Sequence, residues 1–164
     1  MSPSPARTRI RNSAAFTRNI EALQVCDRIS SALPAEIIHD AFDGKKARIV
    51  AWIDGGGNID AKFDGELSGI YAGATLLMLT SAYNHVPLVE VLLERQASVD
   101  LQANNGYTAL IAAASNGHLV AVQRLLRAGA DVRLRDDHGV TALQYTKEQA
   151  HDECALAIEK HIEI

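Results

Sequence analysis

The chain repeats its own pattern with a period of 33 residues. When residues 70–102 are placed over residues 103–135, 10 of the 33 aligned positions are identical. The matches are of residue types that form turns and cores, and they include Gly73/Gly106, Thr75/Thr108, Leu77/Leu110, His85/His118, Leu92/Leu125, Leu93/Leu126, Ala97/Ala130 and Val99/Val132. Similarity at a fixed period of this length indicates a scaffold of stacked structural units. Each unit is then stabilised mainly by its neighbours.

The repeat extends in both directions along the chain. Toward the C-terminus, the same shift reproduces Gly139, Thr141, Ala142, Leu143 and His151. Beyond them the match fades, and Glu159 replaces Leu126, as stacking predicts for a last unit whose outer face has no neighbour. Upstream the shift becomes 40, which places seven extra residues between Asp60 and Gly73. We therefore predict repeats at residues 34–69, 70–102, 103–135 and 136–164.

Each unit has the pattern of two short antiparallel helices. In the third unit, residues 108–116 carry apolar side chains at helical spacing and end at Asn116-Gly117, a common stop signal. Residues 119–128 repeat that spacing and end before Gly129. In the second unit, Pro87 falls near the start of the second helix, where its missing N–H costs nothing. Neither helix could bury its apolar face alone, so the units must stack.

Residues 12–33 are expected to form an N-terminal capping segment. Asn12 to Ser30 has the pattern of one helix, with Phe16, Ile20 and Leu23 on one face. Its simplest role is to cover the exposed face of the first unit. Residues 1–11 hold two Pro, two Ser and three Arg, and we expect them to be a disordered basic tail.

Composition and charge narrow the possible partners. The chain is 48% apolar and 22% charged, as is ordinary for a folded soluble protein. Its net charge of −4 creates no field that attracts a phosphate backbone, so we expect no nucleic-acid partner. Arg7, Arg9, Arg11 and Arg18 run against this trend. These arginines could form a basic arm that contacts nucleic acid or an anionic membrane. Alternatively, they belong to a solvated tail, and the flanking Ser, Thr and Pro favour this second interpretation.

The cysteines and the apolar stretches predict a cytoplasmic protein without a membrane span. Cys26 and Cys154 lie 128 positions apart, with no Cys-x-x-Cys pair, so both are expected to be free thiols in a reducing compartment. No apolar block of signal-peptide type follows the N-terminal arginines, and charges interrupt the longest apolar stretches.

The sequence offers no cluster for catalysis, a metal or a cofactor. His85, His118 and His151 recur at steps of 33, which favours a structural role at the turn between helices. The other three histidines lack paired ligand spacing. A faint calcium-loop pattern from Asp60 fails because Lys62 and Tyr71 occupy ligand positions. The glycines at residues 55–57 follow a helix and precede no Lys-Ser/Thr, so they suit a helix stop better than a phosphate loop. We expect a protein that is not an enzyme.

The third unit resembles an ankyrin repeat almost throughout. Residues 105–131 contain Gly-x-Thr-x-Leu, Ala-Ala, Asn-Gly-His, Leu-Leu and Gly-Ala-Asp at that family's spacing. The family's Thr-Pro-Leu-His tetrad is replaced in this chain by Thr75-Leu-Leu-Met78, Thr108-Ala-Leu-Ile111 and Thr141-Ala-Leu-Gln144. Because the histidine of the tetrad is lost each time, we expect a more apolar seam between units. The resemblance implies an all-α solenoid of about four helix-turn-helix units, with β-hairpin-like connecting loops and an N-terminal capping helix.

That resemblance also implies a role in protein recognition through hairpin tips and the concave face of the first helices. Carried over by position, the tips are Tyr71, Ala72 and Ala74; Asn104, Asn105 and Tyr107; Asp137, His138 and Val140. The helix positions are Ala82 and Tyr83; Ser115 and Asn116; Glu148 and Gln149. Tyr83 and Tyr107 suit either interface anchors or partly exposed scaffold. We expect a monomer that binds another protein; the alternative is an inhibitor or regulatory subunit that occludes a partner enzyme.

The seven-residue insertion within residues 62–72 is the most individual feature. Phe63, Leu67, Ile70 and Tyr71 make it unusually apolar for a solvated loop. A lengthened surface loop costs little entropy, so inert padding is one interpretation. The apolar content favours an interaction role or packing onto the next unit.

Overall fold

The computed structural model describes residues 32–64 and 72–163, which belong to one compact unit, Ser31–Ile164. The described residues form eight α-helices: α2 (Ala35–Phe42), α3 (Lys46–Asp54), α4 (Leu76–Ala82), α5 (Val86–Glu94), α6 (Ala109–Ser115), α7 (Leu119–Arg127), α8 (Ala142–Glu148) and α9 (Asp152–Ile162). The expected capping helix at residues 12–30 and the tail at residues 1–11 lie outside the described residues.

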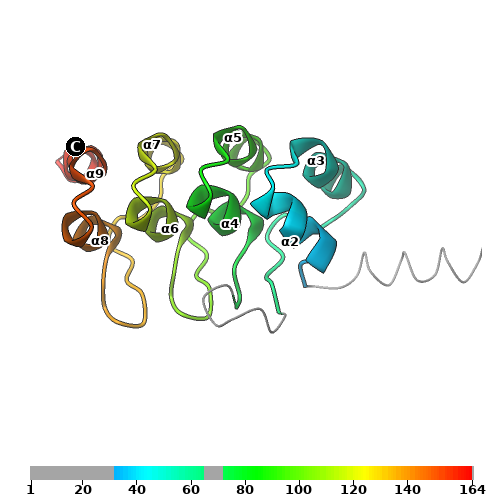
Figure 1. Cartoon of the computed structure of the whole chain (residues 1–164), viewed down its shortest axis with the longest axis horizontal. Coiled ribbons are helices and arrows are strands. Elements are labelled where there is room, and N and C mark those ends of the chain that lie inside the picture. Colours follow the sequence, from blue (N-terminus) through cyan, green and yellow to red (C-terminus); the bar gives the residue numbers. More distant parts are fainter. Residues whose placement is uncertain (1–31, 65–71, 164) are drawn as a thin grey trace, which may run out of the picture. The chain divides into compact units, whose positions relative to one another are not determined.

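The helices pair into four helix-turn-helix units that stack in two rows (Figure 1). The first helices of the units, α2, α4, α6 and α8, lie side by side, and we call them the first-helix row. The second helices, α3, α5, α7 and α9, form the second-helix row. The loops between units extend from the first-helix row, away from the second. The prediction of an all-α repeat fold is confirmed.

Threonines start three of the first helices. The side-chain oxygens of Thr75, Thr108 and Thr141 accept hydrogen bonds from the backbone amides three residues later. Each bond satisfies an amide that has no partner inside the helix. In two units, the residue that replaces the family's histidine also helps to cap the helix. Met78 Sδ and Gln144 Oε1 accept hydrogen bonds from the backbone amides of Thr75 and Thr141, at 3.4 Å and 2.9 Å.

Histidines start three of the second helices, and two of them tie neighbouring units together. His85 Nε2 lies 2.7 Å from the carbonyl oxygen of Phe42, the last residue of α2. His118 Nε2 lies 3.0 Å from the carbonyl oxygen of Ala82, the last residue of α4. A carbonyl oxygen only accepts, so each ring nitrogen donates. The predicted structural role is confirmed for these two histidines.

One apolar core runs through all four units, from Leu33 to Ile158. Helix α6 lies between α4 and α8, and its residues 109–114 are all buried. Four of those six residues are alanines, whose small side chains let the backbones of neighbouring helices approach closely. The seam between the units is therefore apolar, as predicted from the replacement of the histidine in the family's Thr-Pro-Leu-His tetrad.

The loops between units are hairpin-like, although the described residues contain only isolated β-bridges. The amide of Ala103 donates to Tyr107 and that of Asp136 to Val140, at 2.8 Å and 3.1 Å. Neighbouring hairpins are also bonded: the amide of Asn104 donates to Ala72, and that of Asp137 to Asn105, at 2.9 Å and 3.0 Å. The turns are thus held in a row by the main chain.

Phe63, near the start of the segment that contains the insertion, packs into the core. Phe63 is buried, its amide donates to Ala74 at 2.8 Å, and its carbonyl accepts from Gly73 at 2.7 Å. The other apolar residues of the insertion, Leu67, Ile70 and Tyr71, lie outside the described residues. Cys154 is a buried free thiol, and Cys26 also lies outside the described part. No described helix is both long and apolar enough to cross a bilayer.

A buried hydroxyl in α4 yields a stability prediction. Ser81 is 0% exposed, and its Oγ has no hydrogen-bond partner among the described residues. The corresponding residues of the first and third units are Ala41 and Ala114, both fully buried. Burying an unpaired hydroxyl costs about 1–3 kcal/mol, so Ser81→Ala is expected to raise the free energy of unfolding by about 1 kcal/mol in urea denaturation.

The neighbouring hydroxyl provides the control. Thr80 is also fully buried, but its Oγ1 donates to the carbonyl of Leu76 at 2.9 Å. Thr80→Ala should therefore lower the free energy of unfolding. Equal losses from the two substitutions would contradict the prediction for Ser81.

Candidate protein-binding groove

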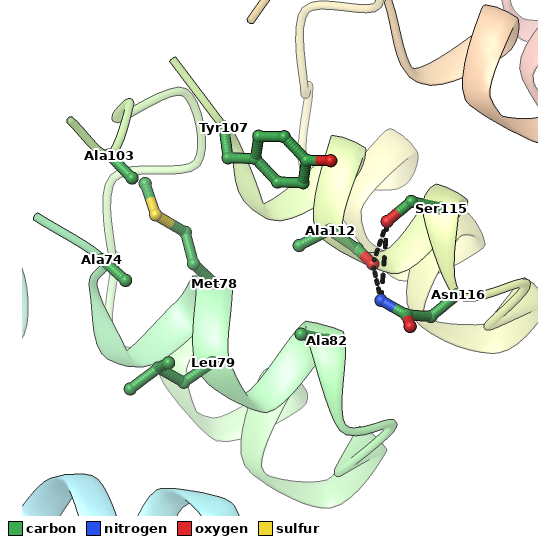
Figure 2. A pocket seen from close by; sticks show the side chains of 9 residues that line it. All are labelled: Ala74, Met78, Leu79, Ala82, Ala103, Tyr107, Ala112, Ser115 and Asn116. Carbon is green, nitrogen blue, oxygen red and sulfur yellow. Dashed lines mark hydrogen bonds between the residues drawn. The ribbon is translucent and has the colours of Figure 1, made fainter. Parts of the chain in front are cut away.

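A groove of about 230 Å³ lies between α4 and α6, beside the hairpin that precedes α6 (Figure 2). The residues that line it are mostly small or apolar: Ala74, Met78, Leu79, Ala82, Ala103, Tyr107, Ala112, Ser115 and Asn116. Met78, Leu79 and Ala82 come from α4, and Ala112 and Ser115 from α6. None of the lining residues is charged.

The groove exists because small residues occupy positions that are filled elsewhere in the stack. Ala82 corresponds to Phe42 in the first unit, where that ring packs edge-on against Tyr83 at 5.0 Å. Ala112 corresponds to Tyr145 in the fourth unit. A methyl group in place of a ring leaves a hollow between adjacent helices. The repeat alignment thus contains the signal for this site, although Ala82 was predicted as a binding position and Ala112 was not.

Polar side chains form one end of the groove (Figure 2). Ser115 Oγ donates to the carbonyl oxygen of Ala112 at 3.2 Å, and Asn116 Nδ2 donates to the same oxygen at 2.8 Å. These bonds hold both side chains at the C-terminal end of α6. Tyr107 lies at the other side, with its backbone amide bonded to Asn105 Oδ1 at 3.1 Å. The groove therefore offers an apolar floor between hydrogen-bonding groups.

Several of the residues carried over from the resemblance lie together at this groove. Ala74, Ala82, Tyr107, Ser115 and Asn116 all line it. Ala74 is only 4% exposed, so it forms part of the wall and is not an exposed tip. Met78, Leu79, Ala103 and Ala112 also line the groove, although none of them was predicted as a site residue.

The remaining expected residues flank the groove or lie elsewhere. Tyr83 follows the last residue of α4, is 43% exposed, and stacks on His85 with ring centroids 6.4 Å apart. Asn104, Asn105, Asp137 and His138 occupy the turns of two adjacent hairpins, and Val140 accepts from Asp136. Glu148 and Gln149 lie at the end of α8 and are exposed. Tyr71 lies outside the described residues.

A buried carboxylate fixes the aromatic side of the groove. The ring of Tyr107 lies 5.6 Å from that of Tyr145, whose hydroxyl donates to Asp136 Oδ2 at 2.6 Å. Asp136 Oδ1 also accepts from the amides of His138 and Val140 at 3.0 Å and 2.8 Å. Burial raises the pKa of Asp136, but these hydrogen bonds outweigh it and hold the pKa below 3.8. Burial and the bond to Asp136 raise the pKa of Tyr145.

This network gives a pH-dependent prediction. Tyr145→Phe removes a hydrogen bond to a charged group and should lower the free energy of unfolding by about 1–3 kcal/mol at pH 7. Because the pKa of Asp136 is lower in the folded chain, the ionised form stabilises the fold above the ordinary value of 3.8. That stabilisation is lost as the pH falls through the lowered pKa. Denaturation from pH 7 to 3 should show the difference between the two proteins shrinking below about pH 4; a constant difference would contradict the assignment.

No group of described residues has the arrangement of His, Cys, Asp or Glu that could hold a metal ion. The groove contains no nucleophile paired with a base. Its lining combines apolar surface with hydroxyl and amide groups.

The comparisons with known proteins agree with the geometry. A family model for ankyrin repeats, in three copies, matches residues 39–136 and again residues 77–164. A search of curated protein sequences found no match. The family matches span most of the described helices, and ankyrin repeats are generally protein–protein interaction modules. The chain belongs to the ankyrin-repeat family.

Proposed function

We propose that this chain binds a partner protein through the α4–α6 groove, the hairpin turns beside it and the exposed ends of the first helices. The observation that supports the proposal is the groove itself. It joins residues from two repeats and the intervening hairpin into one apolar hollow with polar ends. Buried apolar anchors surrounded by a polar rim are the usual anatomy of a protein interface.

The volume favours a side chain of a protein over a free small molecule. Pockets for small molecules typically enclose about 300–1,000 Å³ and bury most of the ligand. This groove has only about 230 Å³. One or two apolar side chains of a partner would fill it, with Tyr83 and Tyr107 as rigid aromatic contacts.

Affinity capture from the native cell extract tests the proposal. The wild-type chain is the first bait, and a chain carrying Tyr83→Ala and Tyr107→Ala is the second. The control bait carries Val120→Ala and Leu156→Ala, which remove apolar groups that are 47% and 54% exposed on the second-helix row. We expect a protein retained by the wild type and the control but lost with the tyrosine variant. Loss with the control, or retention by all three, would contradict the proposed surface.

The same capture separates plain binding from inhibition. If the retained protein is an enzyme, its activity is measured with increasing amounts of the wild-type chain. An activity that falls to zero at saturation would indicate an inhibitor that occludes the active site, whereas unchanged activity would indicate a scaffold.

A further inference from the structure

We propose that the groove takes an apolar side chain from a basic segment of the partner, with a lysine or arginine about three residues from the apolar anchor. This inference rests on the proposed function and adds the chemistry of the partner. It is carried by the distribution of charge over the first-helix row and the hairpins.

Every lysine and arginine in the described first helices and hairpins is already engaged. Arg133 pairs with Asp131, and Lys147 pairs with Glu159. Lys62 Nζ donates to the carbonyl of Gln102, and Arg135 Nη1 to that of Gly139, both at 2.7 Å. These cations are therefore occupied within the chain itself.

Three exposed carboxylates of the same surface have no such partner among the described residues: Asp64, Asp137 and Glu148. These three carboxylates outnumber Lys62 and Arg135, whose charges are not neutralised by their carbonyl partners, so the net charge of the described part of this surface is negative. Complementary charge steers association and fixes register, so a partner segment that carries positive charge fits this surface best.

Two of these carboxylates lie on the α8 side of the groove. The backbone amide of Asp137 donates a hydrogen bond to the carbonyl oxygen of Asn105 at 3.0 Å. Asn105 lies in the hairpin that contributes Ala103 and Tyr107 to the groove. Glu148 occupies in α8 the position that Ser115 occupies in α6, and α8 packs against α6. Adjacent packed helices are about 8–10 Å apart, and an extended chain rises about 3.3 Å per residue. An apolar anchor in the groove therefore allows a side chain about three residues away to reach Asp137 if the segment runs along the hairpins, or Glu148 if it runs along the C-terminal ends of the first helices.

Selection from a random-peptide display library on the full chain tests this chemistry. We expect enriched peptides to carry an apolar residue with lysine or arginine about three residues away. Binding of a synthetic enriched peptide should weaken about three- to tenfold with Asp137→Lys and Glu148→Lys together, because each exposed pair contributes modestly. It should also weaken as salt is raised.

A filled groove tests the anchor. Ala82→Phe places a ring where the first unit already carries Phe42, and peptide binding should fall at least tenfold. Ala51→Phe adds the same ring at an exposed position of α3, in the second-helix row, and should leave binding unchanged. Thermal melting of both variants checks that each is folded. If Ala82→Phe does not fold, Leu79→Ala, which widens the groove, should still change affinity for peptides with larger or smaller anchors.

The other outcomes overturn the inference. Acidic or uncharged enriched peptides would show that the charge argument is wrong, and binding unaffected by Ala82→Phe would show that the groove is not the anchor site. If no peptide is enriched, the inference that the partner binds through a short basic segment is wrong. None of these outcomes decides the proposed function. That proposal is tested separately, by whether the wild-type chain retains a partner protein in the affinity capture and the tyrosine variant loses it.

Discussion

Replacing Leu110 by alanine is expected to lower the free energy of unfolding by about 2–5 kcal/mol. Leu110 is 2% exposed in α6, the helix between α4 and α8. The substitution removes the apolar transfer energy of the side chain and leaves a cavity between two unit interfaces. In a stacked array, the coupling to both neighbours is weakened at once.

Leu143 supplies a matched control for this prediction. It holds the same position in α8 as Leu110 holds in α6, but it is only partly buried. Leu143→Ala should therefore cost about half as much or less, because less apolar area leaves water when the fourth unit folds. Urea denaturation followed by circular dichroism gives both values. Equal costs at the two positions would contradict the view that stacking on both sides stabilises the third unit.

The described helices could be predicted from the sequence because three signals agreed. Thr108 as a helix start, Gly117 as a helix stop and a 33-residue period each point to the same boundaries. Leu119 and Leu125 confirm the spacing of α7. Repeat proteins are unusually predictable in this way, because a signal that is weak in one unit is strengthened by its copies.

The groove was harder to predict, because its residues look like core residues. Met78, Leu79 and Ala112 are buried, and an apolar residue at a helical position is usually assigned to packing. What makes them a site is a difference between units, with alanine at 82 where the first unit has phenylalanine. The interaction of Tyr145 with Asp136 could not be predicted either, since Asp136 replaces Ala103 and the repeat gives no precedent for it.

Gly106→Ala is expected to destabilise the chain by about 2–5 kcal/mol, and it reports on the contact between two hairpins. Gly106 has φ +78°, a conformation that costs an L-residue about 1–2 kcal/mol. An added Cβ would also lie 2.8 Å from Asp136 Cα and 2.8 Å from the backbone nitrogen of Asp137. Neither atom is the end of a flexible side chain, so the next hairpin must move, and overpacking of this kind costs about 1–3 kcal/mol more.

Gly139 separates the two costs, because it holds the same place in the next hairpin. It also has φ +78°, but no heavy atom lies within 4 Å of its ideal Cβ position among the described residues. Gly139→Ala should therefore lower the free energy of unfolding by the backbone strain alone, about 1–2 kcal/mol. The difference between the two variants, measured by urea denaturation, is the cost of pushing the hairpins apart. Such a displacement would also move Tyr107 and Asp137, so Gly106→Ala should weaken partner binding while Gly139→Ala preserves it. Equal stability losses with equal binding would mean that the hairpins are not coupled through this contact, and that the turns bind a partner independently of one another.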